Sequence, residues 1–583
     1  MRRFFLFLLT ACLCLLPNFG VAKIKNPDTF IEIRASGGDL ESLDPAYPYD
    51  VASFEILMNV YEPLIWNKGT SIKEFEPLLS EQVPTLENGL LSPDGKTYTF
   101  PVRQNVQFHD GTPLTCKDVR YSILRFMLQD RAGGPSSLML EPIANLQGTR
   151  DKDGKLNVNI DDIFSRVACE GKNLKINLPK PYGPFLSIAS QFSYAVSKKW
   201  AIAHGDWDGT KETWAQYNNP KPQNSYLFDH MNGTGPFMLE RWERNLKEIS
   251  LTRNEKYWRK PAALKRVIIK PVPEFSTRRL MIASGDADYI DEAGAQFESQ
   301  LKDIPNITVL YPPRLRVEGF YFTFNVDATG NPALYSGKLD GNGIPPNFFT
   351  DKDLRKGFAY AFDYDGYIKD VLKGRATRPT GCIPHDMLGF NANQPVYSLN
   401  LEKAKEHFKR AWGGQVWEKG FRLAIYYDTN NESRHMPCEI LKRNVESLNP
   451  KFKIDVRTLQ WSSFMADIRK GRLPMFKLGW LADFADPHNF AFSFLHSEGQ
   501  YPKEQGFAYP EWDKLVQQAN YTPDPKAREA IYFKLQELAY EEVPQIYTDE
   551  PLSFKVFRTW VKGYVLNPIF PGLYYYPITK SES

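Results

Sequence analysis

A mixed α/β protein of more than one domain is the fold class that the sequence predicts. Segments with strand-like and helix-like patterns alternate along the whole chain, and neither internal repeats nor low-complexity linkers interrupt them. The 583 residues, of which 42% are hydrophobic and 24% charged, can bury a large core, and chains of this length divide into about two to four domains. A disordered or fibrous protein is excluded.

Several segments have patterns clear enough to predict individual elements. A helix is expected after Thr115, because threonine followed three residues later by Asp118 is the sequence of a capping box. Two other segments have the apolar spacing of amphipathic helices, and two are rich in aromatic and apolar residues, as strands are. The amphipathic helices are predicted at Glu402–Ala411 and Pro525–Glu541, and the strands at Glu318–Asp327 and Met475–Trp480.

The first 22 residues have the three parts of a secretory signal peptide. Met1–Arg3 carries positive charge, Phe4–Leu16 is apolar, and Gly20–Ala22 supplies small residues for cleavage. No later segment approaches the roughly 20 apolar residues that a spanning helix needs. We therefore expect export to the periplasm and a mature protein without an integral membrane segment. Leu9–Cys12 also resembles a lipobox, so lipidation at Cys12 is the alternative.

Charge and motif content exclude several classes of function. The 72 basic and 69 acidic residues are scattered, which leaves no electrostatic footprint for nucleic acid. No GxSxG, HExxH, Walker A or GxGxxG motif is present, and the eight histidines are dispersed, so we predict neither an enzyme nor a cofactor. Four cysteines follow the signal peptide, with no CxxC pair and three open disulfide pairings. They are Cys116, Cys169, Cys382 and Cys438.

Nine short fragments occur in an order that is itself informative. Most are turns or helix starts, so each alone has a local structural explanation. Together they extend over nearly the whole chain after the signal peptide. In this order they resemble the extracellular solute-binding proteins of family 5, which serve peptide, oligopeptide and nickel ABC importers. The fragments are SLDP (42–45), NVYEPL (59–64), DGKTYTF (94–100), FHDGTPLT (108–115), GTGPF (233–237), RNEKYW (253–258), GDAD (285–288), LRKGFAYA (354–361) and GWLADFADP (479–487).

The resemblance implies a bilobed, type II periplasmic-binding-protein-like fold with a third domain inserted in the first lobe. Domain I would comprise residues 23–61, 186–315 and 550–583, domain II residues 62–185, and domain III residues 316–549. The chain would cross between the lobes near Arg314–Val317 and Ile546–Glu550, where changes in backbone angles can absorb a hinge motion. Cys116 departs from the family, which usually has alanine there.

Asp483 is the residue that the resemblance indicates most directly as ligand-binding. It follows the predicted strand that ends at Trp480 and precedes a helix start. In peptide-binding members of the family, an aspartate at this place meets the α-ammonium of the ligand. Such a charged hydrogen bond is strong in a cleft that excludes water. The alternative is a solvated or capping aspartate at the end of a strand.

The residues after Asp483 are expected to start a helix. Asp486 followed by Pro487 is a favoured helix start, so Asp486 is predicted to cap free N–H groups. A lone histidine in a first helical turn, such as His488, is expected to be exposed. Nickel-binding relatives carry a histidine in Asp-Pro-His at this place, which makes His488 the metal candidate under that alternative only.

Arg434 is a candidate for the far end of the ligand. It begins a helix predicted over Ser433–Leu448, and in dipeptide binders an arginine at a similar helix start grips the ligand carboxylate. A guanidinium matches a carboxylate with two parallel hydrogen bonds. The residues around Arg434 depart from the usual pattern, and a surface position is the alternative.

The remaining candidates would form walls for an extended ligand. A receptor for varied peptides can pair with the ligand backbone along strand edges and leave roomy pockets for side chains. The segments Ala35–Leu43 and Gly319–Asn325 are predicted walls, the second contributing Phe320 and Tyr321. Trp480 is expected to pack beside the cleft and is predicted to contact the ligand.

These features predict the substrate-binding receptor of an ABC importer. It would capture oligopeptides or related ligands in a cleft between two lobes and deliver them to the permease subunits and their ATPases. We expect a monomer that does no chemistry. Two alternatives remain open: a receptor for nickel or a metal chelate, relying on His488, and a periplasmic chaperone or hydrolase on the same scaffold. The sequence leaves the length of the ligand open.

Overall fold

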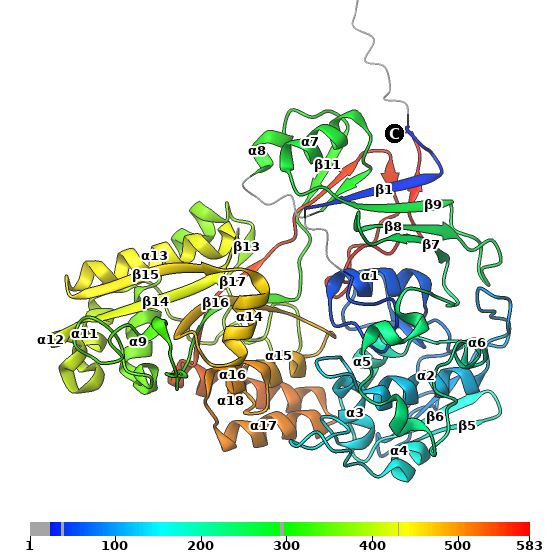
Figure 1. Cartoon of the computed structure of the whole chain (residues 1–583), viewed down its shortest axis with the longest axis horizontal. Coiled ribbons are helices and arrows are strands. Elements are labelled where there is room, and N and C mark those ends of the chain that lie inside the picture. The colour runs from blue at the N-terminus through cyan, green and yellow to red at the C-terminus, as the bar shows by residue number, and fades with distance from the viewer. Residues whose placement is uncertain (1–23, 36–39, 292–296, 430, 583) are drawn as a thin grey trace, which may run out of the picture.

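The computed structural model describes residues 24–35, 40–291, 297–429 and 431–582. The predicted signal peptide and Cys12 lie outside the described residues, as do residues 36–39 of the first predicted wall. Two lobes lie side by side and are joined at one end by two segments of the chain that cross between them (Figure 1). None of the helices in the described ranges is long and apolar enough to cross a membrane.

The first lobe is built on a seven-stranded sheet and a separate three-stranded sheet. The seven-stranded sheet has the order β11-β18-β10-β1-β9-β8-β7, with β1 parallel to both of its neighbours. The smaller sheet has the order β4-β6-β5 and is antiparallel. The strands are β1 Thr29–Arg34, β4 Thr97–Pro101, β5 Val167–Glu170, β6 Asn173–Asn177, β7 Phe237–Glu243, β8 Glu248–Arg253, β9 Arg266–Pro271, β10 Tyr289–Ile290, β11 Ile307–Leu310 and β18 Lys555–Arg558.

Helices of the first lobe surround these sheets, and those from α2 to α4 pack around the smaller one (Figure 1). They are α1 Val51–Val60, α2 Cys116–Gln129, α3 Ser137–Ala144, α4 Ile160–Arg166, α5 Phe185–Phe192, α6 Lys198–Ala203, α7 Phe275–Ser284 and α8 Glu298–Leu301.

The second lobe is built on a six-stranded mixed sheet with the order β13-β17-β12-β16-β14-β15. Its strands are β12 Arg316–Phe322, β13 Ala376–Thr377, β14 Phe421–Asp428, β15 Phe452–Leu459, β16 Met475–Leu481 and β17 Gln545–Pro551. Its main helices are α9 Lys352–Ala361, α11 Leu401–Arg410, α13 Glu432–Leu448, α14 Trp461–Arg469, α15 Pro487–Leu495, α16 Gln500–Gln505, α17 Pro510–Tyr521 and α18 Pro525–Glu542.

The chain crosses between the two large sheets at residues 311–315, between β11 and β12, and at residues 552–554, between β17 and β18. The first crossing overlaps the predicted one. The second comes later than predicted, because Ile546–Glu550 lies inside β17, where Tyr547 pairs with Gly319 of β12. The division into three domains with the predicted boundaries stays a proposal.

Most of the individually predicted elements are confirmed. Helix α2 begins with the predicted capping box of Thr115 and Asp118, and α11 and α18 match the two amphipathic helices. Strand β16 also has the predicted position. Strand β12 is shorter than predicted and ends at Phe322, because the next two N–H groups, of Thr323 and Phe324, donate to carbonyl groups outside the strand ladder.

The disulfide pairing that the sequence left open is resolved in the first lobe. Cys116, at the start of α2, is bonded to Cys169 in β5, 53 residues later. Cys382 and Cys438 are free and buried in the second lobe. The bond therefore links α2 to the three-stranded sheet of the first lobe. This sheet and the helices packed around it form the smaller subdomain of that lobe.

Candidate ligand-binding site

Three strands of the second lobe end at the same edge of their sheet. β14 is parallel to both β15 and β16, so the carboxyl ends of all three meet at one edge. The segment after β16 carries Asp483, and the segment after β15 carries Trp461, whose side chain is 54% exposed. In open α/β sheets, ligands bind outside the carboxyl ends of strands. We therefore expect a ligand-binding site at this edge of the sheet.

Asp483 lies in a cavity between the lobes and is half-buried. Its Oδ2 accepts two hydrogen bonds of 2.9 Å, from the hydroxyl of Tyr49 in the first lobe and from Nδ2 of Asn489 in α15. Burial raises the pKa of Asp483 to about 6, and these two neutral donors only partly offset it. None of the ion pairs found in the described ranges involves this carboxylate, so it is a half-buried acceptor without a cation among those residues.

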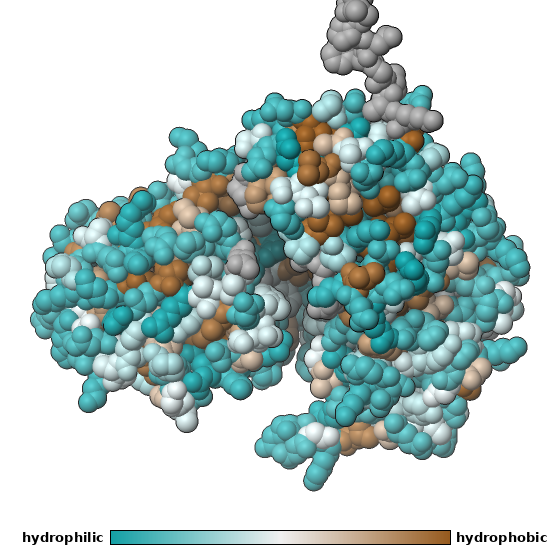
Figure 2. Space-filling model, turned by 45° about the horizontal axis from the view of Figure 1, so that its top comes forward, coloured by the Kyte–Doolittle hydropathy of each residue, from teal (hydrophilic) through white to brown (hydrophobic). Residues whose placement is uncertain are grey.

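The cavity around Asp483 has a volume of about 150 Å³. Residues of both lobes line it, among them Tyr49 and Glu141 from the first lobe and Trp480 and His488 from the second. A hollow also separates the lobes on the molecular surface (Figure 2). The cavity can therefore hold a small charged group that both lobes contact.

Polar contacts hold the lobes together beside this cavity. The Ser187 hydroxyl donates to the Ala485 carbonyl at 3.2 Å, and the Tyr521 hydroxyl donates to Oδ1 of Asn145 at 3.0 Å. His488 Nε2 lies 3.5 Å from Oε1 of Glu141. Each contact joins one lobe to the other, so the cleft is closed on this side.

Gly479 and Trp480, near the end of β16, each have a packing role. Gly479 faces Glu318 of β12, and a Cβ at Gly479 would collide with that carboxylate. Trp480 is half-buried on the cavity wall, and its Nε1 donates to Oδ1 of Asn489 at 2.8 Å. Trp480 thus fixes the amide that also contacts Asp483. Its contact with ligand stays a prediction.

The structural role predicted for Asp486 is confirmed. Its Oδ1 accepts from the N–H of His488 at 2.9 Å and so caps α15, with Pro487 in the first turn. The same carboxylate is held by Arg528 through two hydrogen bonds of 2.8 and 3.0 Å. Both charges are buried and matched, so Asp486 is not available to a ligand.

The expectation that His488 is exposed is wrong. The side chain is buried between α15, α17 and the Glu141 helix, and its residue is only 3% exposed. The prediction failed because the partner surface comes from the other lobe, which the helical pattern cannot reveal. Within the ranges that the structure describes, no three His, Cys, Asp or Glu side chains gather into a group that could hold a metal ion.

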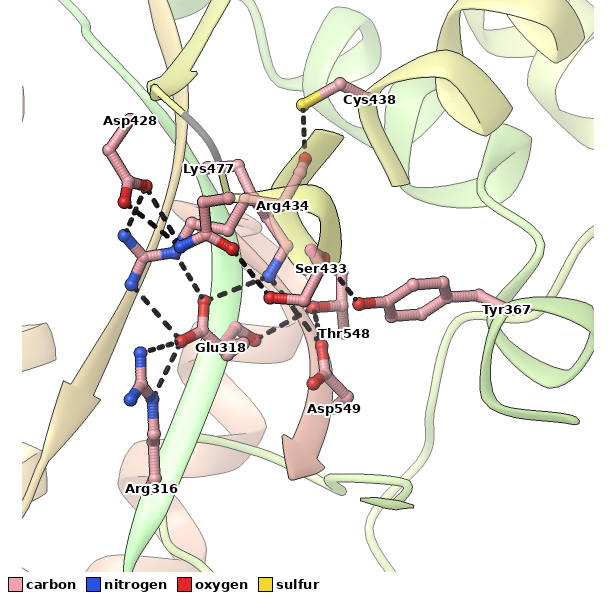
Figure 3. Close-up of polar contacts among 11 residues, drawn as sticks. Arg316, Glu318, Tyr367, Asp428, Ser433, Arg434, Cys438, Lys477, Thr548 and Asp549 are labelled. Atoms are coloured by element: carbon pink, nitrogen blue, oxygen red, sulfur yellow. Dashed lines mark hydrogen bonds and ion pairs between the residues drawn. The ribbon is translucent and has the colours of Figure 1, made fainter. Parts of the chain in front are cut away.

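Arg434 belongs to a buried network of charges rather than to an open surface (Figure 3). Its guanidinium contacts Oδ1 of Asp428 at 2.7 Å and both carboxylate oxygens of Glu318 at 3.3 Å. Arg316 and Lys477 also contact Glu318, at 2.8 and 3.2 Å. The donors of Arg434 are thus used by its own lobe. Its predicted grip on a ligand carboxylate remains untested and has no support in this geometry.

Phe320 and Tyr321 are inside the second lobe and have no exposed surface. The ring of Tyr321 stacks on Phe476 and Tyr501, and the ring of Phe320 packs edge-on against Phe362. Strand β12 lies between β16 and β17, so both of its edges are already paired. We therefore leave Phe320 and Tyr321 out of the contact set that we propose below.

Three residues of the site were missed by the sequence interpretation. Tyr49 is one of thirty tyrosines and has no motif around it. Glu141 lies on the short helix α3, which carried no signal either. Asn489 could have been found, because it lies in the first turn of the helix that Asp486 and Pro487 begin and faces back toward Asp483.

Two lobes that enclose a polar cavity and are linked by two crossing segments of the chain define a solute-binding protein of the type II periplasmic class. A family model described as bacterial extracellular solute-binding proteins, family 5 Middle, matches residues 74–502. The chain belongs to this family, as the nine fragments predicted.

Curated relatives and solved structures agree with this assignment. The chain is 24% identical over 564 residues to the probable D,D-dipeptide-binding periplasmic protein DdpA of Escherichia coli, with 96% of each covered. It is 25% identical over 538 residues to the dipeptide-binding protein DppE of Bacillus subtilis, covering 91% of this chain and 88% of that protein.

Two solved structures show the same fold. The periplasmic binding protein DppA from Helicobacter pylori, in complex with the peptide STSA, has a TM-score of 0.72 at 23% identity and covers 95% of this chain and 98% of that chain. The Escherichia coli murein tripeptide binding protein MppA has a TM-score of 0.72 at 20% identity, with 96% and 99% covered. The predicted bilobed α/β fold is confirmed.

Proposed function

We propose that the protein is the peptide receptor of an ABC importer and that Asp483 binds the N-terminal ammonium of the peptide. The observation that carries this proposal is the half-buried carboxylate of Asp483, which two neutral donors contact and no cation in the described ranges balances. Burying an unpaired charge is costly, and a ligand ammonium would supply the missing partner. Both hydrogen bonds go to Oδ2, so Oδ1 is the oxygen that we assign to the ammonium.

The walls of the proposed site are aromatic. Trp480 lines the cavity itself, and Trp461 stands at the neighbouring strand end, where an aromatic ring can pack against a peptide. Arg434 would not bind the far carboxylate, because Asp428 and Glu318 already match its charge. We therefore propose that the receptor holds the amino end of the peptide firmly and places no fixed cation at its other end.

Delivery follows from the class of protein. We propose that the loaded receptor works in the periplasm, presents the peptide to permease subunits driven by their ATPases, acts as a monomer and does no chemistry. The probable D,D-dipeptide-binding protein and the dipeptide-binding protein DppE, to which the chain is similar, support a peptide as the ligand.

A pair of peptides that differ only at the amino end tests the proposal. Ala-Ala-Ala and N-acetyl-Ala-Ala-Ala would be titrated into the purified receptor by isothermal calorimetry. Acetylation removes the ammonium charge, so we expect at least a hundredfold loss of affinity. Equal affinities would contradict the role of Asp483. Native mass spectrometry of freshly purified protein would show retained peptide, and a retained ligand of another class would contradict the peptide assignment.

A further inference from the structure

We infer that an acidic side-chain pocket beside Asp483 selects peptides whose first residue carries a positive charge, such as lysine, ornithine or arginine. The inference rests on the proposed function, because the pocket receives the side chain of the residue whose ammonium Asp483 binds. It adds a preference for one class of peptide to that function.

The pocket is a second cavity that continues from the first. Its volume is about 230 Å³, many times the roughly 30 Å³ that one water molecule takes in the liquid. Four residues line both cavities, so a side chain can pass from one into the other. They are Glu141, Gln147, His488 and Phe492.

Helix α15 presents one face to this pocket. His488 and Phe492 lie four residues apart in α15, which places them on the same side of the helix, and His496 is the residue that ends it. Their rings contact one another in sequence, with centroids 5.4 and 4.8 Å apart. Helix α17 contributes Asn520 on one side, and α3 of the first lobe contributes Glu141 on the other. The pocket is complete only when the lobes are together.

Two buried polar atoms at this pocket have no hydrogen-bond partner. They are Nδ1 of His488 and Oδ1 of Asn520, on residues that are 3% and 2% exposed. The other polar atoms of these two side chains contact each other, with Nδ2 of Asn520 donating to Nε2 of His488 at 3.2 Å. Buried polar atoms in folded proteins are nearly always paired. Of the two, Oδ1 of Asn520 is an acceptor, which is the kind of atom that an ammonium needs. Nδ1 of His488 carries the ring proton when Nε2 accepts, so it is a donor and does not contribute to binding a cation.

The charges around the two cavities favour a cation. Asp483 and Glu141 are carboxylates that line them, and none of the described lining residues is a lysine or an arginine. Among the ion pairs of the described residues, Glu141 has one contact, to Nε2 of His488 at 3.5 Å, and none to a lysine or an arginine. The ligand ammonium would be matched by Asp483 and a second positive charge by Glu141.

Two peptides that differ by one charge test the pocket. Lys-Ala-Ala and norleucyl-Ala-Ala have the same first side chain except for the terminal ammonium of lysine. By isothermal calorimetry we expect the wild-type receptor to bind Lys-Ala-Ala at least tenfold more tightly. In Glu141→Gln the ratio of the two affinities should fall below threefold, whatever the change in the affinity for either peptide alone. Glu87→Gln, an exposed glutamate of the same lobe, is the matched control and should keep the preference.

Thermal unfolding of each variant checks that it is folded. The comparison of the two peptides on the wild-type receptor does not depend on any variant. Equal affinities of the two peptides for the wild type, or an unchanged preference in Glu141→Gln, would overturn the pocket assignment while peptide capture stands. If the wild type bound none of Lys-Ala-Ala, norleucyl-Ala-Ala and Ala-Ala-Ala, the proposed function would fail, and the pocket assignment would fall with it.

Discussion

Tyr49 of the first lobe donates a hydrogen bond of 2.9 Å to Oδ2 of Asp483 in the second lobe, 434 residues away in the chain. Asn489 donates to the same oxygen. The carboxylate is thereby held by one donor from each side of the cleft, and Oδ1 takes part in neither bond. Closure of the lobes and the orientation of the proposed ligand anchor are therefore coupled through this one side chain.

Replacing Asp483 by asparagine should weaken peptide binding without unfolding the protein. Asparagine keeps the shape of the side chain and loses the charge that the ammonium needs. Removing one partner of a buried charged hydrogen bond costs about 2 to 5 kcal/mol, so the affinity for Ala-Ala-Ala should fall at least about thirtyfold. Isothermal calorimetry measures the change, and an unchanged affinity would exclude Asp483 as the anchor.

Replacing Tyr49 by phenylalanine should have a smaller effect in the same direction. The ring remains, but Asp483 loses the donor that links it to the first lobe, and hydrogen bonds to charged groups contribute about 1.5 to 3 kcal/mol. Because the Tyr49 side chain is 39% exposed, we expect the lower end, roughly a tenfold loss of affinity. Tyr226→Phe is a matched control, since Tyr226 is 38% exposed on the same lobe. A tenfold loss in the control as well would contradict a specific role for Tyr49.

Peptide affinity should fall as the pH drops through about 6. Burial raises the pKa of Asp483 to about 6 in the ligand-free cleft, and only the ionised carboxylate pairs with an ammonium. Between this pH and about pH 7 the carboxylate is charged, the peptide ammonium keeps its proton and the affinity should be constant, whereas near pH 8 loss of the ammonium proton lowers it slightly. Below it, binding must first remove a proton, so the affinity should decrease by up to tenfold per pH unit. Titrations between pH 5 and pH 8 would show this, and Asp483→Asn should remove the dependence.

Much of the fold could be predicted because its signals are local. The capping box at Thr115 and the amphipathic pattern of Pro525–Glu541 depend on residues within a few turns of one another, and both predictions hold. The order of nine fragments then placed the chain in its family. The second crossing between the lobes was predicted a few residues too early. The sequence does not show whether the chain stays paired in its sheet to the end of a strand or leaves the sheet earlier.

The site was less predictable because its two halves come from different lobes. Asp483 was predicted from the family resemblance. Tyr49, which contacts Asp483, and Glu141, which contacts His488, belong to segments without a motif. The burial of Arg434 and Tyr321 likewise depends on contacts made by residues far away in sequence. A periodic pattern shows that a residue faces a core or a surface and does not identify the partner across a cleft.

Glu318 should be essential for the stability of the second lobe. Burial alone would raise its pKa, but the cations of Arg434, Arg316 and Lys477 hold the pKa of Glu318 well below its usual range. In Glu318→Gln these cations lose their central partner, and breaking a buried ion pair costs about 3 to 5 kcal/mol. Urea unfolding should show this loss, with Glu87→Gln as the exposed control.

The pH dependence of the Glu318 contribution has a definite sign. A carboxylate with a lowered pKa in the folded state stabilises the protein above its ordinary pKa, and the contribution disappears as the pH falls through the lowered value. The difference in stability between wild type and Glu318→Gln should therefore be constant near neutral pH and begin to shrink only below the ordinary glutamate pKa of 4.5. A difference that shrank above pH 6 would contradict the network as its source.

Reduction of the disulfide should destabilise the smaller subdomain of the first lobe. Cys116 and Cys169 close a loop of chain with a sequence separation of 53, for which the chain-entropy relation gives about 4 kcal/mol. Dithiothreitol, or replacement of both cysteines by serine, should lower the midpoint of urea unfolding. The double variant should no longer respond to dithiothreitol, because Cys382 and Cys438 are free thiols. If mass spectrometry proved complete reduction of the wild type and the midpoint stayed the same, the bond would have no stabilising role.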